Sequence, residues 1–324
     1  MLEQIVAKIN EQNETIRIVF PEGKSKRIQE ILPKFANTKI IPVLVFKTRA
    51  EIPTEILENK KLEIVVVEEQ DLAALANYLF ELRKGKLSLS EAQRLVTECN
   101  YLAVLWVKLD KAQAMVGGIE YDTKDIIGPA LKIIKPRPGI KLVSSFFLML
   151  RGEEKYIFTD GSLNIDPSSE ELADIAELGY EASQIFNFSN PNLVLLSFST
   201  KGSGKGPLVD KVRNAYKLVL EKNLPCQIDG EFQFDAAWDD NIRKIKAPNS
   251  PITHRADIYV FPSLNAANIG YKIAQRMGGY QAVGPIIIGL DKPVNDLSRG
   301  ATGEEIYFTA IVTAYMHIYN QNKK

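Results

Sequence analysis

The sequence contains little cysteine and little histidine. Cys99 and Cys226 are its only cysteines, and His254 and His317 its only histidines. Two distant cysteines cannot build a disulfide framework or a cysteine zinc site. Two histidines are too few for a histidine metal cluster or for a catalytic scheme that needs several histidines. We therefore expect no metal site.

The chain also lacks a net charge, because 40 Lys and Arg balance 40 Asp and Glu. Binding to nucleic acid or to an anionic membrane through bulk electrostatics needs a large basic excess, so we expect neither partner. No stretch reaches the ~20 apolar residues of a membrane span, and the acidic, interrupted N-terminus is not typical of a signal peptide. We expect a cytoplasmic protein that acts on small molecules.

Short β-branched runs alternate with helical patterns along the whole chain. Most of these runs are almost continuously apolar, as in parallel strands that are buried on both faces. The predicted strands are 16–20, 40–46, 64–68, 102–107, 192–198, 256–261 and 285–290. The alternation indicates βαβ units and an α/β fold.

One stretch interrupts the alternation. Residues 141–150 and 155–160 are two apolar runs around the short segment Arg151-Gly152-Glu153-Glu154. This pattern predicts an antiparallel hairpin, and we place a domain boundary just before it.

The segment 199–207, Ser-Thr-Lys-Gly-Ser-Gly-Lys-Gly-Pro, follows a predicted strand and precedes a predicted helix. It is not a P-loop, because Ser199 stands where the first glycine is required and Gly206 where a hydroxyl should bind magnesium. A glycine-rich strand-to-helix loop lets backbone N–H groups approach an anion. We interpret the segment as an anion-binding loop assisted by Lys201 and Lys205, with a flexible connection as the alternative.

The segment 295–305 leads into a predicted helix that extends to about residue 318. Thr302 and Glu305 have the spacing of a capping box. Ser298 and Arg299 come just before the helix N-terminus, where hydroxyl, guanidinium and backbone N–H groups converge on an oxyanion or phosphate. Glu305 is placed to act as a base. The spacing favours the structural and the functional interpretation equally.

Two asparagines, Asn265 and Asn268, follow the predicted strand that ends near residue 261. Asn268 is a natural helix cap. The carboxyl end of a strand is also where α/β folds bind ligands, so both asparagines are candidate ligand-binding residues.

Over nearly its full length the chain resembles the phosphate acetyltransferases, also called phosphotransacetylases. The segments that carry the resemblance are 17–23 (RIVFPEG), 82–86 (LRKGK), 129–135 (PALKIIK), 196–204 (LSFSTKGSG), 246–248 (KAP), 268–276 (NIGYKIAQR) and 292–300 (KPVNDLSRG). The last three together are highly specific.

The resemblance implies two three-layer α/β/α domains separated by a cleft, of the isocitrate/isopropylmalate-dehydrogenase-like type. It implies that the C-terminal segment returns to the first domain. We therefore predict domain 1 as residues 1–140 plus 296–324, and domain 2 as residues 141–295. Domain 2 would hold the glycine-rich loop and the contacts of a homodimer.

The resemblance also implies reversible transfer of an acetyl group between coenzyme A and phosphate, with no permanently bound cofactor. The catalytic residues that it implies are Ser298 for the oxyanion or phosphate, Arg299 for phosphate and Glu305 as base. Arg83 would bind phosphate or coenzyme A. The predicted substrate-binding residues are Arg83, Thr123, Ser199, Thr200, Lys201, Gly202, Ser203, Gly204, Asn265 and Asn268.

The sequence departs from the family pattern at two site positions. Glu305 stands where the family usually has Asp, which lengthens the reach of the carboxylate by one methylene. Gly128 stands where the family usually has a phosphate-binding Arg, and Asp122 adds a negative charge nearby. These departures leave two alternatives open: a phosphate butyryltransferase, and a non-catalytic homologue that binds coenzyme A or a partner.

Overall fold

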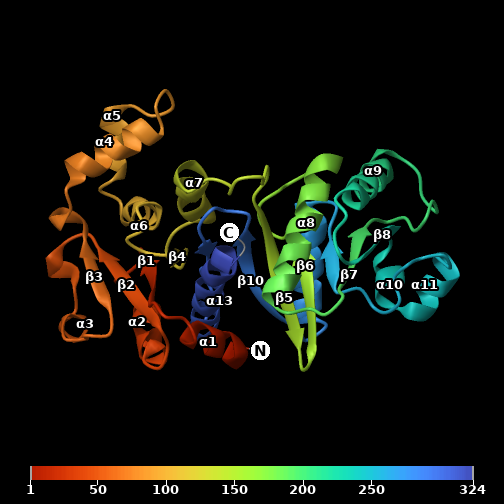
Figure 1. Cartoon of the computed structure of the whole chain (residues 1–324), viewed down its shortest axis with the longest axis horizontal. Helices are drawn as coiled ribbons and strands as arrows, with labels where there is room; N and C mark the ends of the chain where they lie inside the picture. Colours follow the sequence, from red (N-terminus) through yellow and green to blue (C-terminus); the bar gives the residue numbers. More distant parts are fainter. Residues whose placement is uncertain (1, 323–324) are drawn as a thin grey trace. The chain divides into compact units, whose positions relative to one another are not determined.

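The computed structural model describes residues 2–322, which form two compact units (Figure 1). Unit 1 comprises the chain up to Pro138 together with the segment from Leu290 onward. Unit 2 comprises Gly139–Gly289.

The sheet of unit 1 is entirely parallel. Its strands are β1 (Ile16–Phe20), β2 (Ile40–Phe46), β3 (Glu63–Val66), β4 (Ala114–Gly117) and β11 (Val294–Asp296). Their order across the sheet is β11-β4-β1-β2-β3. Almost every residue of β1 and β2 is buried, which explains why the sequences of these parallel strands are nearly continuous apolar runs.

Unit 1 also contains helices. They are α1 (Leu2–Asn10), α2 (Lys26–Ile31), α3 (Thr54–Leu57), α4 (Leu72–Leu82), α5 (Leu89–Leu95), α6 (Cys99–Lys108), α7 (Thr123–Ile133) and α13 (Gly303–Asn322), with short 3-10 turns at Leu32–Phe35, Arg49–Glu51 and Val67–Glu69. α13 lies beside α1 and α2 and also contacts β4, which places both ends of the chain in unit 1 (Figure 1). Ser88 caps α5 through a capping box with Glu91.

The predicted strand at 102–107 is wrong, because these residues lie within α6. A short apolar run does not distinguish a buried strand from a buried helix, and here five of the six residues are buried in the helix. The prediction missed two strands of this sheet: β11, at its edge, and β4, which lies between β11 and β1.

The sheet of unit 2 is mixed. Its strands are β5 (Ser144–Arg151), β6 (Glu154–Thr159), β7 (Asn192–Leu196), β8 (Gln227–Phe232), β9 (Ile258–Val260) and β10 (Gln281–Ile288). Their order is β10-β5-β6-β9-β7-β8. β5 and β6 form the predicted antiparallel hairpin, which is confirmed, and β10 pairs antiparallel with β5. The remaining pairs are parallel.

The helices of unit 2 begin at recognisable signals. They are α8 (Ser169–Ile185), α9 (Pro207–Glu221), α10 (Phe234–Trp238), α11 (Asp240–Lys246) and α12 (Leu264–Arg276). Ser168 caps α8, and Pro207 is the first residue of α9, where its missing N–H costs nothing. The interpretation of Asn268 as a cap is wrong: Ser263 caps α12, and Asn268 lies in its second turn.

The strand order of unit 1 indicates where a ligand would bind. From β1 the chain proceeds to β2 and β3 on one side, whereas β4 and β11 lie on the other side of β1. Open α/β sheets bind ligands outside the carboxyl ends of their strands at such a reversal. Within residues 2–322 no helix is both long and apolar enough to cross a membrane.

Candidate functional site

Three loops meet at the carboxyl ends of β1, β4 and β11. The backbone N–H of Leu297, after β11, donates to the carbonyl of Gly117 at the end of β4 (2.7 Å). Glu22, after β1, accepts from backbone N–H groups of the loop after β4, at Gly118 (3.0 Å) and Glu120 (2.7 Å). The topology of the sheet thus brings together segments that are distant in sequence.

Arg27, in the first turn of α2, fixes the loop after β11. Its Nη1 donates to the carbonyl oxygens of Arg299 (2.7 Å) and Ala301 (3.0 Å). The loop that carries the predicted catalytic pair therefore has its shape set by a guanidinium from another element. Sequence reasoning missed this residue, and nothing in the local sequence around Arg27 signals its role.

Ser298 and Arg299 are both exposed at this loop. The Ser298 Oγ accepts from the backbone N–H of Gly300 (3.3 Å), which leaves the hydroxyl proton available to a ligand. The Arg299 guanidinium forms an ion pair with Asp122, which precedes the first residue of α7. The structure thus brings the predicted phosphate-binding arginine against the carboxylate that departs from the family pattern.

Glu305 lies in the first turn of α13 and forms the predicted capping box. Its Oε2 accepts from the backbone N–H (2.8 Å) and the Oγ1 (3.1 Å) of Thr302, and Thr302 Oγ1 accepts from the Glu305 N–H (3.3 Å). The structural interpretation of this pair is confirmed, and the role of Glu305 as a base stays a prediction.

Thr123 opens α7, and its hydroxyl donates to Asp296 Oδ2, at the last position of β11 (2.6 Å). Asp296 is only 3% exposed. Burial, with a further contribution from the charge of Glu22, raises the pKa of Asp296 to about 7. Burial also raises the pKa of Glu22, although backbone hydrogen bonds oppose it.

Gly128 lies on α7 in open space, since a Cβ added there would meet no atom within 4 Å. Nearby in the same unit, Arg83 at the end of α4 donates from Nη1 to the carbonyl of Lys132 on α7 (3.2 Å). Both residues, with Lys86, line a small cavity of about 70 Å³. A basic pocket is therefore present at the C-terminal end of the helix that lacks the expected arginine.

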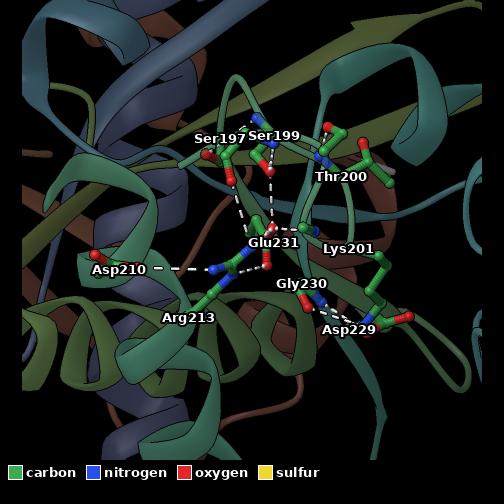
Figure 2. Close-up of polar contacts among 12 residues, drawn as sticks. Ser197, Ser199, Thr200, Lys201, Asp210, Arg213, Asp229, Gly230 and Glu231 are labelled. Atoms are coloured by element: carbon green, nitrogen blue, oxygen red, sulfur yellow. Dashed lines mark hydrogen bonds and ion pairs between the residues drawn. The ribbon is translucent and has the colours of Figure 1, made fainter. Parts of the chain in front are cut away.

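In unit 2, the glycine-rich loop is held by hydrogen bonds and ion pairs to other residues of the protein (Figure 2). Glu231, 3% exposed at the end of β8, accepts from Ser199 Oγ (2.9 Å) and from the backbone N–H of Gly202 (2.8 Å). Arg213 of α9 donates to the same carboxylate (3.1 Å). Burial alone would raise the pKa of Glu231, but Arg213 and these hydrogen bonds hold it below the usual value.

Two further groups of this loop also form hydrogen bonds to other groups of the protein. The Lys201 ammonium pairs with the buried Asp229 and donates to the carbonyl of Gly230 (2.9 Å). The backbone N–H of Gly204 donates to Ser199 Oγ (2.9 Å). These groups therefore already have hydrogen-bond partners within the protein, and anion binding by this loop stays a prediction.

Asn265 and Asn268 lie one turn apart on α12, at the start of a surface that exposes large apolar side chains. These exposed side chains are Phe198 (59%), Phe234 (45%), Ile269 (59%), Ile273 (52%) and Met277 (85%). Beside them, aromatic residues including Tyr156, Phe158 and Trp238 line a cavity of about 720 Å³ in unit 2.

The cysteines carry no reactive thiol. Burial raises the pKa of Cys226 to about 12, and burial raises that of Cys99 to about 11. The thiolate is the nucleophilic form, so burial disfavours reaction at both side chains at neutral pH. In the described part of the chain, no group of three or more His, Cys, Asp or Glu residues is arranged to hold a metal ion.

Sequence reasoning did not identify the groups that shape these loops: the buried Glu22, Asp229 and Glu231 and the half-buried Arg27 and Arg213. Glu22 had a detectable signal, because an acidic residue two positions after the end of a strand is placed at the ligand-binding edge of the sheet. Glu231 and Asp229 lie two positions apart in a strand whose last five residues are buried, and buried charges of this kind require partners.

Residues 1–314 match the family described as phosphate acetyl/butaryl transferase. The chain is 43% identical to the phosphate acetyltransferase of Mycoplasma capricolum subsp. capricolum over 317 residues, covering 97% of this chain and 98% of that one. A solved phosphotransacetylase from Streptococcus pyogenes is 40% identical, with a TM-score of 0.91 over 98% of this chain and 99% of that chain.

A 4-hydroxythreonine-4-phosphate dehydrogenase from Klebsiella pneumoniae shares the fold alone. It is 10% identical, with a TM-score of 0.52 over 94% of this chain and 99% of that chain. The predicted α/β fold with two units and a likeness to dehydrogenases is confirmed.

Proposed function

The chain belongs to the phosphate acetyl/butaryl transferase family of acyltransferases, and on that premise we propose that it transfers an acetyl group reversibly between coenzyme A and phosphate. The observation that carries the proposal is the junction between β11 and α13. It places a hydroxyl, a guanidinium and a carboxylate, Ser298, Arg299 and Glu305, on one short loop and the first turn of one helix.

We propose direct attack within a ternary complex. The thiolate of coenzyme A attacks the carbonyl carbon of acetyl phosphate and forms the C–S bond. The bond between that carbon and the bridging oxygen then breaks, and phosphate leaves with the electron pair. The thiol proton passes to Glu305. Because Oε2 is used in the capping box, we assign the proton to Oε1.

The other two groups act on developing charge. Ser298 donates its hydroxyl to the carbonyl oxygen as it becomes an oxyanion, a contact that strengthens in the transition state. Arg299 binds the phosphate group with charge-assisted hydrogen bonds. For this the guanidinium must exchange Asp122 for the substrate, and the exposure of both side chains permits that exchange (66% and 45% exposed).

We assign substrate binding to Arg83 and Thr123 in unit 1 and to the glycine-rich loop with Asn265 and Asn268 in unit 2. The basic cavity at Arg83 and Lys132 supports a role for Arg83 in holding phosphate groups. In the loop, the internal bonds to Glu231 hold Ser199 and Gly202 in one conformation, which reduces the entropy lost when a ligand binds.

Two features favour a second candidate, a homologue with altered specificity or without turnover. Gly128 leaves open space where the family's arginine would stand, and Asp122 occupies the guanidinium of Arg299. Such a homologue would either transfer a butyryl group or bind coenzyme A without reaction.

One assay separates the candidates. The purified protein is given acetyl phosphate and coenzyme A, and thioester formation is followed by ultraviolet absorbance. Turnover above that of Ser298→Ala supports acetyl transfer. Turnover with butyryl phosphate alone selects the butyryltransferase, and no turnover with either donor selects the non-catalytic homologue.

We further propose that the protein is a homodimer that acts in the cytoplasm. The apolar surface formed by Phe198, Phe234, Ile269, Ile273 and Met277 supports self-association, since exposed apolar patches of this kind mark interaction sites. A two-fold dimer would bury the same patch of both subunits.

A further inference from the structure

Asp296 is a carboxyl group that the proposed reaction does not use, although it lies two residues before Ser298. Its Oδ2 accepts from Thr123, and its Oδ1 is buried with no hydrogen-bond partner among residues 2–322. Gly118 (φ +110°) closes over this oxygen, and a Cβ at Gly118 would collide with it. Asp296 is thus buried beside the loop after β4, with Thr123 as its side-chain hydrogen-bond partner.

The surroundings of Asp296 favour its neutral form. A buried carboxylate is stable only when several donors compensate its charge. Glu22, 5% exposed, has such donors in the backbone N–H groups of Gly118, Glu120 and Tyr121. Asp296 has the Thr123 hydroxyl and a smaller contribution from the backbone N–H of Leu297. If the two acids share one proton, Asp296 is therefore the one that holds it.

The charged groups around Asp296 come from the loop after β1 and from the two helices that contact β11. β4, its neighbour in the sheet, carries no charged side chain. The groups are Glu22 after β1, Asp122, Lys124 and Asp125 at the start of α7, and Glu304 and Glu305 at the start of α13. Asp122 is paired with Arg299 and Lys124, and Glu22 is the one that raises the pKa of Asp296.

The protonation of Asp296 decides what Thr123 presents to a ligand. A threonine hydroxyl has one proton. When Asp296 is ionised, that proton is given to Oδ2 and only lone pairs face outward. When Asp296 is protonated, its own O–H donates to Thr123 Oγ1, and the threonine proton becomes available. The 2.6 Å separation suits either direction.

We propose that Asp296 is a positioning residue that directs the Thr123 hydroxyl, so that Thr123 donates to the phosphate group of the substrate only while Asp296 carries a proton. This inference rests on the proposed function, in which Thr123 binds substrate. Its consequence is a phosphate affinity that falls as Asp296 loses its proton near neutral pH, independently of the thiol chemistry.

The test is the pH dependence of KM for acetyl phosphate. In the wild type, KM should rise about tenfold between about pH 6 and about pH 8, following the protonated fraction of Asp296. Asp296→Asn has no titratable proton, so its KM should lose this rise. Thr123→Val should have a high KM at both pH values, and Thr123→Ser, which keeps the hydroxyl, should retain the wild-type profile.

The ionisation of the phosphate group itself is common to all these proteins and cancels in the ratio of wild type to variant. A wild-type rise that persists in both Asp296→Asn and Thr123→Val would overturn the proposal. If Asp296→Asn fails to fold, Thr123→Val and Thr123→Ser decide alone. If the wild type shows no turnover, the proposed function fails, and the calorimetric affinity for inorganic phosphate at the two pH values then tests the inference.

Discussion

The guanidinium of Arg299 is paired with the carboxylate of Asp122, although the two residues belong to loops that follow different strands. The pairing of β11 with β4 brings these loops together. The arginine that we assign to phosphate is therefore already bound to an anion of the protein. Substrate must compete with that anion, which connects a departure from the family pattern to a measurable binding constant.

Replacing Asp122 by Asn should lower KM for acetyl phosphate. An exposed ion pair is worth about 0–1 kcal/mol, so freeing Arg299 should lower KM by up to about fivefold. Steady-state kinetics measure the effect. Asp125→Asn, which removes the same charge three residues further along the chain, in the first turn of α7, is the matched control and should change KM little. Equal KM values in the two variants would show that Asp122 does not compete with substrate.

Replacing Gly128 by Arg should lower the apparent KM for acetyl phosphate, because the side chain enters open space on α7 and restores a guanidinium. The substitution also removes a glycine from a helix interior, worth about 1 kcal/mol of stability. Gly128→Ala gives the same gain in stability without adding a charge, so it separates the effect of stability from the effect of the guanidinium. An unchanged KM in Gly128→Arg would show that another residue, such as Arg83 or Lys132, already fills the role.

Replacing Glu231 by Gln should lower the stability of unit 2 by about 2 kcal/mol, because Arg213 loses its buried charged partner and keeps only the exposed Asp210. The depressed pKa of Glu231 means that its stabilisation is present above about pH 4.5 and is lost as pH falls through the folded-state pKa. As the pH decreases, the free energy of unfolding of the wild type should therefore fall more steeply than that of Glu231→Gln.

Glu221→Gln, at an exposed position, is the control, and it should match the wild type both in stability near neutral pH and in the loss of stability at low pH. A Glu231→Gln protein as stable as the wild type near neutral pH would contradict the role of Glu231 in holding the loop.

Replacing Ile273 by Glu should convert the proposed homodimer into a monomer. The side chain is 52% exposed in the C-terminal half of α12, within the apolar surface of unit 2, and a charge there would be buried unpaired in a dimer. Analytical ultracentrifugation measures the mass. The exposed Leu57→Glu in unit 1 is the control. A wild type that sediments as a monomer at all concentrations would refute the dimer.

Much of the fold is predictable because burial on both faces leaves a plain signal. The bounds of β1 and β2 match the apolar runs residue for residue, and the hairpin of β5 and β6 follows from its turn. The run at 102–107 failed because a fully buried helix is equally apolar. The prediction missed β4, β8 and β11, which contain residue types that are rare in strands: Ala and Gly in β4, Asp, Gly and Glu in β8, and Asn and Asp in β11.

The candidate site is predictable only in its local parts. The capping box of Thr302 and Glu305 follows from a spacing of three residues. The pair of Asp122 with Arg299 and the bonds of Arg27 to the same loop depend on which strands are neighbours in the sheet. Strand order is a property of the whole chain, so no local pattern contains these contacts.

The most direct test of the account compares the turnover of Glu305→Gln with that of Glu304→Gln, using acetyl phosphate and coenzyme A. Glutamine also forms a capping box, so Glu305→Gln keeps the start of α13 and removes only the base. We predict that its kcat falls at least about a hundredfold, as for loss of a general base. Glu304→Gln should keep the wild-type kcat. Equal kcat values in the two variants would contradict the assignment of Glu305 and with it the proposed mechanism.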